Sequence, residues 1–366
     1  MGEFKPGLEG VIAGQTDICC VDQGKLLYRG YPIAELAEKA SFTQVAHLLL
    51  YGELPTESQH AEFVSMLDGF HGLAPGVIEA IRRIPKQAPM MDVLRTGVSM
   101  AGHFDPVAGA SPEDLRRRAV WLLAVCSDVV ATRFRLINGK EPVPPRPGLP
   151  HAAQILYMCH GSPPDDTSAR LLELTLILYA EHDFNASTFA CRVIGSTESD
   201  MVSSVVGAIG ALKGPLHGGA NEKAMELILQ FKSAQEADAW VRDVLARKGK
   251  VMGFGHRVYK HGDHRAHILE REMRQLAKEK GRQDLVAIYD AIKDPIVNKD
   301  KPIYPNVDYP CGLTYYLMDL PLDLYTPLFV CSRVSGWCAH YIEQQTDNRI
   351  YRPLSHYTGP AVRPVP

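Results

Sequence analysis

Apolar residues recur every three or four positions along almost the whole chain, and this spacing strongly limits what the chain can fold into. The segment 33–50 is a clear case and stops just before Gly52 and Pro55. Its apolar residues at helical spacing are Leu36, Ala37, Ala40, Val45, Leu48 and Leu49. Such spacing gives an α-helix one apolar face, so it predicts a helix here. Similar patterns predict helices over 58–70, 76–84, 91–102, 112–137, 166–180, 199–212, 220–231, 235–247, 264–280 and 325–345.

Three stretches depart from this periodicity. Residues 11–28 read as short strands. The segment 138–150 holds five prolines and is either a domain linker or an extended surface segment. The segment 294–310 is also proline-rich, and long irregular segments inside compact domains are often functional. We predict a mainly α-helical protein with a small N-terminal β element, in one large or two moderate domains.

Composition excludes several classes of protein. The 366 residues carry 39 Lys and Arg against 42 Asp and Glu, a net charge of −3, whereas a dedicated nucleic-acid binder is usually strongly basic. No apolar run is long enough to span a membrane, because Glu173 and Glu181 interrupt the best candidate. Residues 1–10 have no apolar stretch and so do not read as a signal or transit peptide. We therefore expect a cytoplasmic protein that binds neither nucleic acid nor membrane.

The first candidate site residue is His217, in a turn rich in glycine and proline over 213–220. The positive end of the helix beginning near Ala220 disfavours an imidazolium, which leaves a neutral ring able to donate a hydrogen bond. The surrounding glycines allow close approach by a ligand. A histidine that only caps or packs the turn is an equally good interpretation.

The second candidate is a cluster of histidines and cations over 253–267. Its four histidines, His256, His261, His264 and His267, suggest a metal site. The segment has no cysteine, however, and its cations Arg257, Lys260 and Arg265 would repel a metal ion. Carboxylates or phosphates are better ligands for such a cluster. We therefore predict an anion site and no bound metal.

The third candidate is Asp308, which closes the proline-rich segment. It is either a helix N-cap or a general base, and a base would need apolar surroundings that raise its pKa. Sequence leaves both interpretations open.

Four further polar residues are candidates, and the first three lie in apolar surroundings. His182 and Asn185 are spaced to share one helix face, which suits a polar ligand between helices. Arg333 lies within an apolar helical segment and needs an anionic partner if it is buried. Arg352 lies in the C-terminal segment 349–353.

Several separated motifs together resemble the citrate synthase family, including its 2-methylcitrate synthase branch. The strongest are PLHGGANEKAMELI (215–228), GFGHRVYK (253–260), NVDYPCGLTYYLM (306–318) and YTPLFVCSRVSGWCAHYIEQ (325–344). GLEGV (7–11), LLYRGYPI (26–33), MDVLRTGVSM (91–100) and RPLSHYTGP (352–360) extend the likeness over essentially the whole chain.

The resemblance implies a two-domain helical fold and a homodimer. The large domain would comprise 1–218 and 320–366, with the dimer contacts and the oxaloacetate site. The small domain, 219–319, would supply the CoA side of the cleft and catalytic histidine and aspartate residues. The start near GLEGV leaves no room for the extra domain of hexameric, NADH-regulated members, so we expect a dimer without that regulation.

The resemblance also implies a role for each candidate residue. His217 would hydrogen-bond the thioester carbonyl, and Asp308 would remove the α-proton. His256 would polarise the keto oxygen of oxaloacetate. The residues expected to hold its carboxylates are His182, Arg265, Arg333 and, from the partner subunit, Arg352. Those expected to bind the CoA phosphates are Lys260 and Arg257.

The implied reaction joins acetyl-CoA, oxaloacetate and water to give citrate and CoA through citryl-CoA. Acetyl-CoA is a co-substrate, and no cofactor is permanently bound. A 2-methylcitrate synthase using propionyl-CoA is the alternative within the family, because one methylene changes binding by only about 1–3 kcal/mol. An inactive CoA- or metabolite-binding homologue is the alternative from another class. The family's Asp-Pro-Arg reads Asp263-His264-Arg265 here, so proline no longer fixes the backbone before the arginine.

Overall fold

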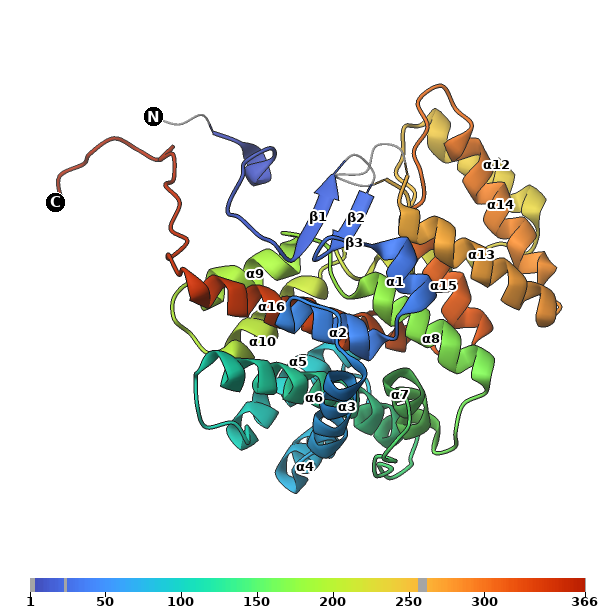
Figure 1. The fold of residues 1–366 in the computed structure, drawn as a ribbon. Helices are drawn as coiled ribbons and strands as arrows, with labels where there is room; N and C mark the ends of the chain where they lie inside the picture. Colours follow the sequence, from blue (N-terminus) through green and yellow to red (C-terminus); the bar gives the residue numbers. More distant parts are fainter. Residues whose placement is uncertain (1–3, 23–24, 256–261, 366) are drawn as a thin grey trace.

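The computed structural model describes residues 4–22, 25–255 and 262–365. Sixteen α-helices and one small sheet make up most of this described chain (Figure 1). The α-helices are α1 (Ile33–Lys39), α2 (Phe42–Tyr51), α3 (Glu57–Phe70), α4 (Pro75–Arg83), α5 (Met90–Ala101), α6 (Pro112–Ile137), α7 (His151–His160), α8 (Asp166–Tyr179), α9 (Ala186–Gly195), α10 (Met201–Leu212), α11 (Ala220–Ile228), α12 (Ala234–Ala246), α13 (His264–Glu279), α14 (Gln283–Val297), α15 (Asp308–Leu317) and α16 (Tyr325–Thr346). Short 3₁₀ helices lie at Pro6–Leu8, Gly102–Phe104 and Leu322–Leu324. The predicted mainly α-helical class is confirmed.

The strands occupy less of the N-terminal region than the sequence suggested. They are β1 (Cys19–Asp22), β2 (Lys25–Tyr28) and β3 (Tyr31–Pro32), paired antiparallel in that order. Residues 11–18 are not strands. Tyr28 at the end of β2 is fully buried, and its hydroxyl donates a 3.0 Å hydrogen bond to the carbonyl of Glu181. The sheet therefore anchors the chain that leaves α8.

Several predicted helix boundaries were wrong for identifiable reasons. The single helix expected over 33–50 is two helices, because Ser41 and Gln44 form a capping box that starts α2 afresh. The helices α7, α9 and α14 were not predicted. α14 runs through Pro295, near its C-terminal end, so the segment expected to be irregular from 294 begins as helix. The proline-rich stretch 138–150 is irregular, as expected.

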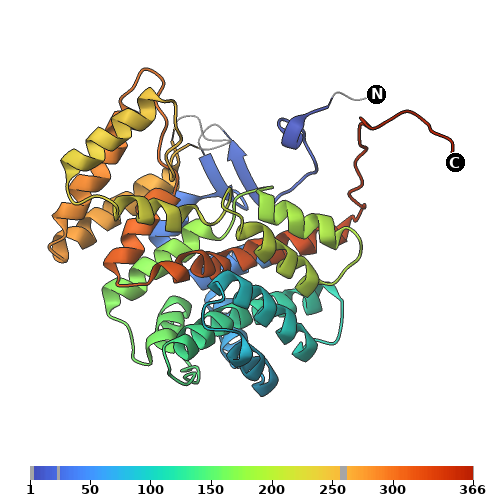
Figure 2. The same ribbon diagram turned by 180° about the vertical axis from the view of Figure 1, so that it is seen from behind.

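Two long helices form the centre of the core. α16 crosses the middle of the molecule in both views and packs on α6 (Figure 1 and Figure 2). Eighteen residues of α16 are buried, including Arg333 and Trp337. Gly336 allows a close crossing, since a Cβ there would lie 2.4 Å from the carbonyl oxygen of Ala180. The end of α8 therefore lies directly against α16.

The helices α12 to α14 form a lobe at one side of the molecule (Figure 1). In this part α12 packs on α14, and α13 packs on α15. The proposed domain boundaries at 218 and 320 stay a prediction. Within the described residues, no helix is both long and apolar enough to cross a lipid bilayer.

Candidate active site

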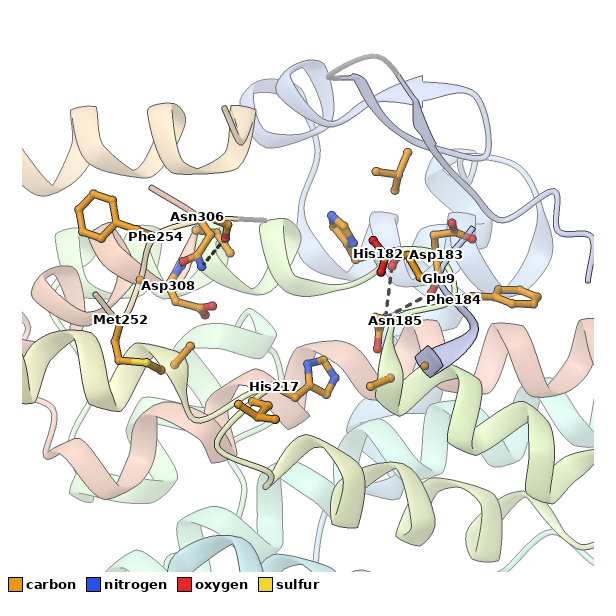
Figure 3. Close-up of a pocket in the computed structure, with 18 of the residues that line it drawn as sticks. Glu9, His182, Asp183, Phe184, Asn185, His217, Met252, Phe254, Asn306 and Asp308 are labelled. Carbon is orange, nitrogen blue, oxygen red and sulfur yellow. Dashed lines mark hydrogen bonds between the residues drawn. The ribbon is translucent and has the colours of Figure 1, made fainter. Parts of the chain in front are cut away.

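A cleft of about 1260 Å³ gathers most of the candidate residues. Figure 3 shows His182, His217 and Asp308 around it. The predicted site residues that line the cleft are His182, His217, Arg265, Asp308 and Arg333. They come from five separate places: the α8–α9 loop, the turn before α11, and helices α13, α15 and α16. Sequence segments far apart in the chain therefore meet at one site.

Four other predicted residues are not placed in this cleft. His256, Arg257 and Lys260 lie outside the described residues. Arg352 is exposed in the C-terminal segment, where its guanidinium donates to the carbonyl of the adjacent Pro353. In the described residues no group of three or more His, Cys, Asp or Glu could hold a metal ion.

Asp308 is the first residue of α15, and a paired loop positions it. Residue 254 bridges to residue 305, and the backbone N–H of Asn306 donates to the carbonyl of Gly253. Gly253 has φ 84°, and a Cβ there would lie 2.8 Å from the Tyr309 ring. Glycine is therefore required for the loop to pack against α15.

The carboxylate of Asp308 does not cap its helix, so the N-cap interpretation is wrong. Val307 is the N-cap residue, and Asp308 Oδ1 instead accepts a 2.7 Å hydrogen bond from the Tyr179 hydroxyl. Burial raises the pKa of Asp308 to about 6, against the lowering effects of the Tyr179 hydrogen bond and the Arg265 and Arg333 charges. A carboxylate with this pKa is ionised at neutral pH yet basic enough to accept a proton.

His217 is held as a neutral hydrogen-bond donor. Burial, together with the charge of Arg333, lowers its pKa to about 4. The backbone N–H of Ser187 donates to His217 Nε2 at 3.3 Å, so we assign the ring proton to Nδ1. The low pKa agrees in direction with the sequence prediction, although burial is its main cause. Figure 3 shows the His217 ring directed into the cleft.

Ser187 is a positioning residue that sequence reasoning missed. Its hydroxyl oxygen lies 2.8 Å from both His217 Nε2 and Asn185 Oδ1 and accepts a hydrogen bond from Trp337 Nε1 at 3.1 Å. Asn185 caps α9 and is not on a helix face with His182, so that expectation was wrong. The Asn-Ala-Ser sequence before an apolar run is typical of a helix start and could have revealed the cap.

Tyr179, the last residue of α8, is the second residue that was missed. It is buried, and its backbone carbonyl accepts a 2.6 Å hydrogen bond from Arg333 Nε. Its hydroxyl contacts Asp308, so one residue connects the carboxylate with the arginine. A buried tyrosine needs a hydrogen-bond partner, but periodicity made Tyr179 look like the end of an apolar face.

The two arginines of the cleft differ in their partners. Arg265, 4% exposed, forms a two-point pair with Asp263, with Nε–Oδ1 at 3.0 Å and Nη2–Oδ2 at 2.8 Å. Asp263 also caps α13. The ion pair and the cap therefore hold Arg265 in place, although the residue before it is His264 and not the expected proline. Arg333 is 1% exposed, and no carboxylate in the described part of the chain forms a salt bridge with it. A buried cation facing a cleft favours an anionic ligand.

A buried charged network lies beneath the α8–α9 loop. His340 on α16 is fully buried, with Nε2 3.0 Å from Glu181 Oε1 and Nδ1 3.0 Å from Arg192 Nη1. Arg192 also pairs with Glu343. These bonds connect Glu181, the neighbour of His182, with α16, the helix that carries Arg333. They therefore fix the α8–α9 loop relative to α16.

The rest of the cleft suits a longer ligand. Leu216 and Met252 expose apolar side chains beside the candidate residues. Lys250 and Lys299 also line the cleft, and neither forms a salt bridge within the described ranges. Apolar walls with free cations suit a ligand that carries both an apolar chain and phosphate groups.

Comparisons with known proteins relate this chain to one family. The family model described as citrate synthase, C-terminal domain, matches residues 7–354. A citrate synthase of Mycolicibacterium smegmatis is 43% identical over 96% of this chain and 94% of its own length. A 2-methylcitrate synthase of Mycobacterium tuberculosis is 42% identical over 100% of this chain and 93% of its own.

A solved structure adds a likeness in three dimensions. Citrate synthase from Thermoplasma acidophilum, in a ternary complex with carboxymethyl coenzyme A and oxaloacetate, has a TM-score of 0.95 and 32% identity. The match covers 100% of this chain and 98% of that one. The family model, the relatives and the likeness in fold together show that this chain belongs to the citrate synthase family.

Proposed function

We propose that this protein condenses an acyl-CoA with oxaloacetate and water, and that citrate is the product from acetyl-CoA. The single observation that carries the proposal is that the Asp308 carboxylate, the neutral His217 ring and the buried Arg333 line one cleft. These groups supply a base, a hydrogen-bond donor and an anion site. Condensing a thioester with a dicarboxylate needs all three.

The reaction begins with enolisation. Asp308 accepts the α-proton of the thioester, and His217 Nδ1–H donates to the oxygen on which negative charge develops. A base and a donor acting together make a weakly acidic C–H bond reactive at neutral pH. The enol carbon then forms a bond with the keto carbon of oxaloacetate, whose oxygen takes a proton from His256. Water finally cleaves the C–S bond and releases CoA.

Oxaloacetate binds through its carboxylates. Arg333 is the principal anion ligand, because Arg265 already shares its charge with Asp263. His182 and Arg265 complete the site within one subunit. For CoA, we propose that Lys250 and Lys299 assist Lys260 and Arg257 with the phosphates, while the acyl-CoA acts as a substrate and not as a resident cofactor.

The enzyme is proposed to act as a homodimer with Arg352 reaching the partner's cleft. Exposed apolar side chains on both end segments support a partner surface, including Ile12 and Leu354, each 90% exposed. These end segments extend from the same side of the molecule (Figure 1). The cleft is proposed to lie between the domain 219–319 and the rest of the chain.

The thioester assay tests the proposed function directly. CoA release is measured from acetyl-CoA and from propionyl-CoA, each with and without oxaloacetate. We expect release that depends on oxaloacetate and a higher kcat/KM for acetyl-CoA. A preference for propionyl-CoA would favour a 2-methylcitrate synthase, which the 42% identity to that enzyme makes the second candidate. No dependence on oxaloacetate would leave an inactive binding homologue.

Mixed dimers test the contribution of Arg352. Arg352→Ala should weaken oxaloacetate use, and His217→Ala should be nearly inactive. Random mixing of the two chains should restore about a quarter of the wild-type sites, because one cleft of each mixed dimer then has both residues. Mixed dimers without activity, under conditions where subunit exchange is verified by mass spectrometry, would contradict donation across the interface.

A further inference from the structure

The Tyr179 hydroxyl contacts the proposed base from a different helix. Tyr179 ends α8, Asp308 begins α15, and 129 residues separate them in sequence. The O–H···Oδ1 distance of 2.7 Å is that of a short hydrogen bond to a charged acceptor. Tyr179 is 1% exposed, so water does not compete for this bond.

The two oxygens of Asp308 are therefore not equivalent. Oδ1 accepts from Tyr179, while no donor among the described residues hydrogen-bonds Oδ2. The backbone of Asp308 is held as well, because its N–H donates to Asn306 Oδ1 at 3.2 Å. With one oxygen and the main chain fixed, the carboxyl group cannot turn freely in the cleft.

We infer that Tyr179 is a positioning residue of the reaction, which holds Asp308 Oδ1 so that Oδ2 is the oxygen that accepts the α-proton. This inference rests on the proposed function, since it needs Asp308 to act as the base. In the step, the C–H bond breaks and its proton forms an O–H bond on Oδ2. The C–H electron pair becomes the new C=C bond, and the π pair of the C=O bond moves to the thioester oxygen, which His217 stabilises. Tyr179 keeps its own proton throughout.

The bond to Tyr179 also affects when Asp308 is ionised. The other charged or titratable groups that face Asp308 are Arg265 and Asp263 at the start of α13, Arg333 on α16 and Cys311 on α15. Burial and Asp263 raise the pKa of Asp308, whereas Tyr179 and the two arginines lower it. Removing the hydroxyl should raise the pKa further, so the base should become active only at higher pH.

The variant Tyr179→Phe isolates the hydroxyl. The ring contact with Phe329, 4.2 Å between centroids, and the carbonyl contact with Arg333 are both kept. We expect the acid limb of kcat/KM for the acyl-CoA, measured at saturating oxaloacetate, to move up by about one pH unit. The KM for oxaloacetate should stay unchanged, because the Arg333 site is intact.

Tyr315→Phe is a matched control. Tyr315 lies on the same helix as Asp308, is fully buried and donates a 2.9 Å hydrogen bond to Thr175 on α8, but it does not line the cleft. Its loss should lower the melting temperature without moving the acid limb. A Tyr179→Phe profile that coincides with the wild-type profile, or one that moves equally with Tyr315→Phe, would overturn the inference.

A second measurement does not depend on turnover. The carboxylate of Asp308 can be titrated by infrared spectroscopy of protein labelled with ¹³C-aspartate, using Asp308→Asn to identify its band. Tyr179→Phe should raise the observed pKa, and replacing Tyr179 with the more acidic 3-fluorotyrosine should lower it. Wild-type protein without CoA release would refute the proposed function, whereas an Asp308 band unmoved in both variants would refute the inference alone.

Discussion

Replacing Asp308 with asparagine is expected to lower kcat by about 10³-fold. The substitution keeps the size of the side chain and removes its ability to accept a proton. Oxaloacetate binding should be nearly unchanged, because Arg333 and His182 do not hydrogen-bond Asp308 in the described chain. Steady-state CoA release measures kcat, and titration calorimetry measures the binding of oxaloacetate.

The wild-type pH profile provides a second check on the same residue. With a pKa of about 6, Asp308 is protonated and inactive below that value and ionised above it, so the rate should rise as pH passes through about 6. The rise should be absent from the residual activity of Asp308→Asn. Asp319→Asn is a suitable control, because Asp319 is exposed just beyond the same helix. Turnover of Asp308→Asn within about tenfold of wild type would contradict the assignment of the base.

The helical class could be predicted from the sequence because apolar residues every three or four positions form one buried face on each helix. The helix expected over 112–137 has those bounds in the structure, where Ser111 forms a capping box and Pro112 starts the helix. The break at Ser41 was missed because the apolar spacing continues across it. The proline-rich segment was expected to be irregular from residue 294, yet α14 continues two residues past Pro295.

The site could be predicted only as far as its residue types reveal chemistry. Asp308 was found because it closes a proline-rich segment just before a helix, and Arg333 because a guanidinium in an apolar helix needs an explanation. Tyr179 was missed because its hydroxyl gains a role only when α8 and α15 pack together. The unequal partners of Arg265 and Arg333 are likewise a property of the packing. Sequence motifs therefore identified candidate residues, whereas only the fold shows which of them contact one another.

Replacing Arg333 with methionine is expected to separate function from stability. Arg333 is 1% exposed, and its guanidinium donates Nε–H to the Tyr179 carbonyl and lies 4.8 Å from the centroid of the Phe329 ring. No salt bridge in the described chain offsets its desolvation, and the nearby Glu181 is already bonded to His340. An apolar side chain of similar length removes this desolvation cost, which is about 1–4 kcal/mol. It leaves the Tyr179 carbonyl without its donor, which offsets part of that gain, and we expect the ligand-free protein to be more stable on balance.

The same change should nearly abolish the use of oxaloacetate. Losing a buried charge that binds a carboxylate costs about 2–5 kcal/mol, which corresponds to a fall of roughly 30- to 5000-fold in kcat/KM. Thermal unfolding with and without oxaloacetate measures the change in stability and the loss of oxaloacetate binding. The melting temperature of Arg333→Met should be higher than that of wild type without ligand, and oxaloacetate should no longer raise it.

Arg133→Met is the control that decides the argument. Arg133 is equally buried, at 2% exposure, but its guanidinium donates to the carbonyls of Ile84, Pro85 and Lys86. Its loss removes three hydrogen bonds to backbone carbonyls at the end of α4, so this variant should melt at a lower temperature and still use oxaloacetate. If both variants lost stability alike while oxaloacetate still stabilised Arg333→Met, then Arg333 would be a structural arginine. A higher melting temperature for Arg333→Met and a lower one for Arg133→Met would mean that Arg333 reduces the stability of the fold. The protein would then keep this arginine because the oxaloacetate dianion needs it.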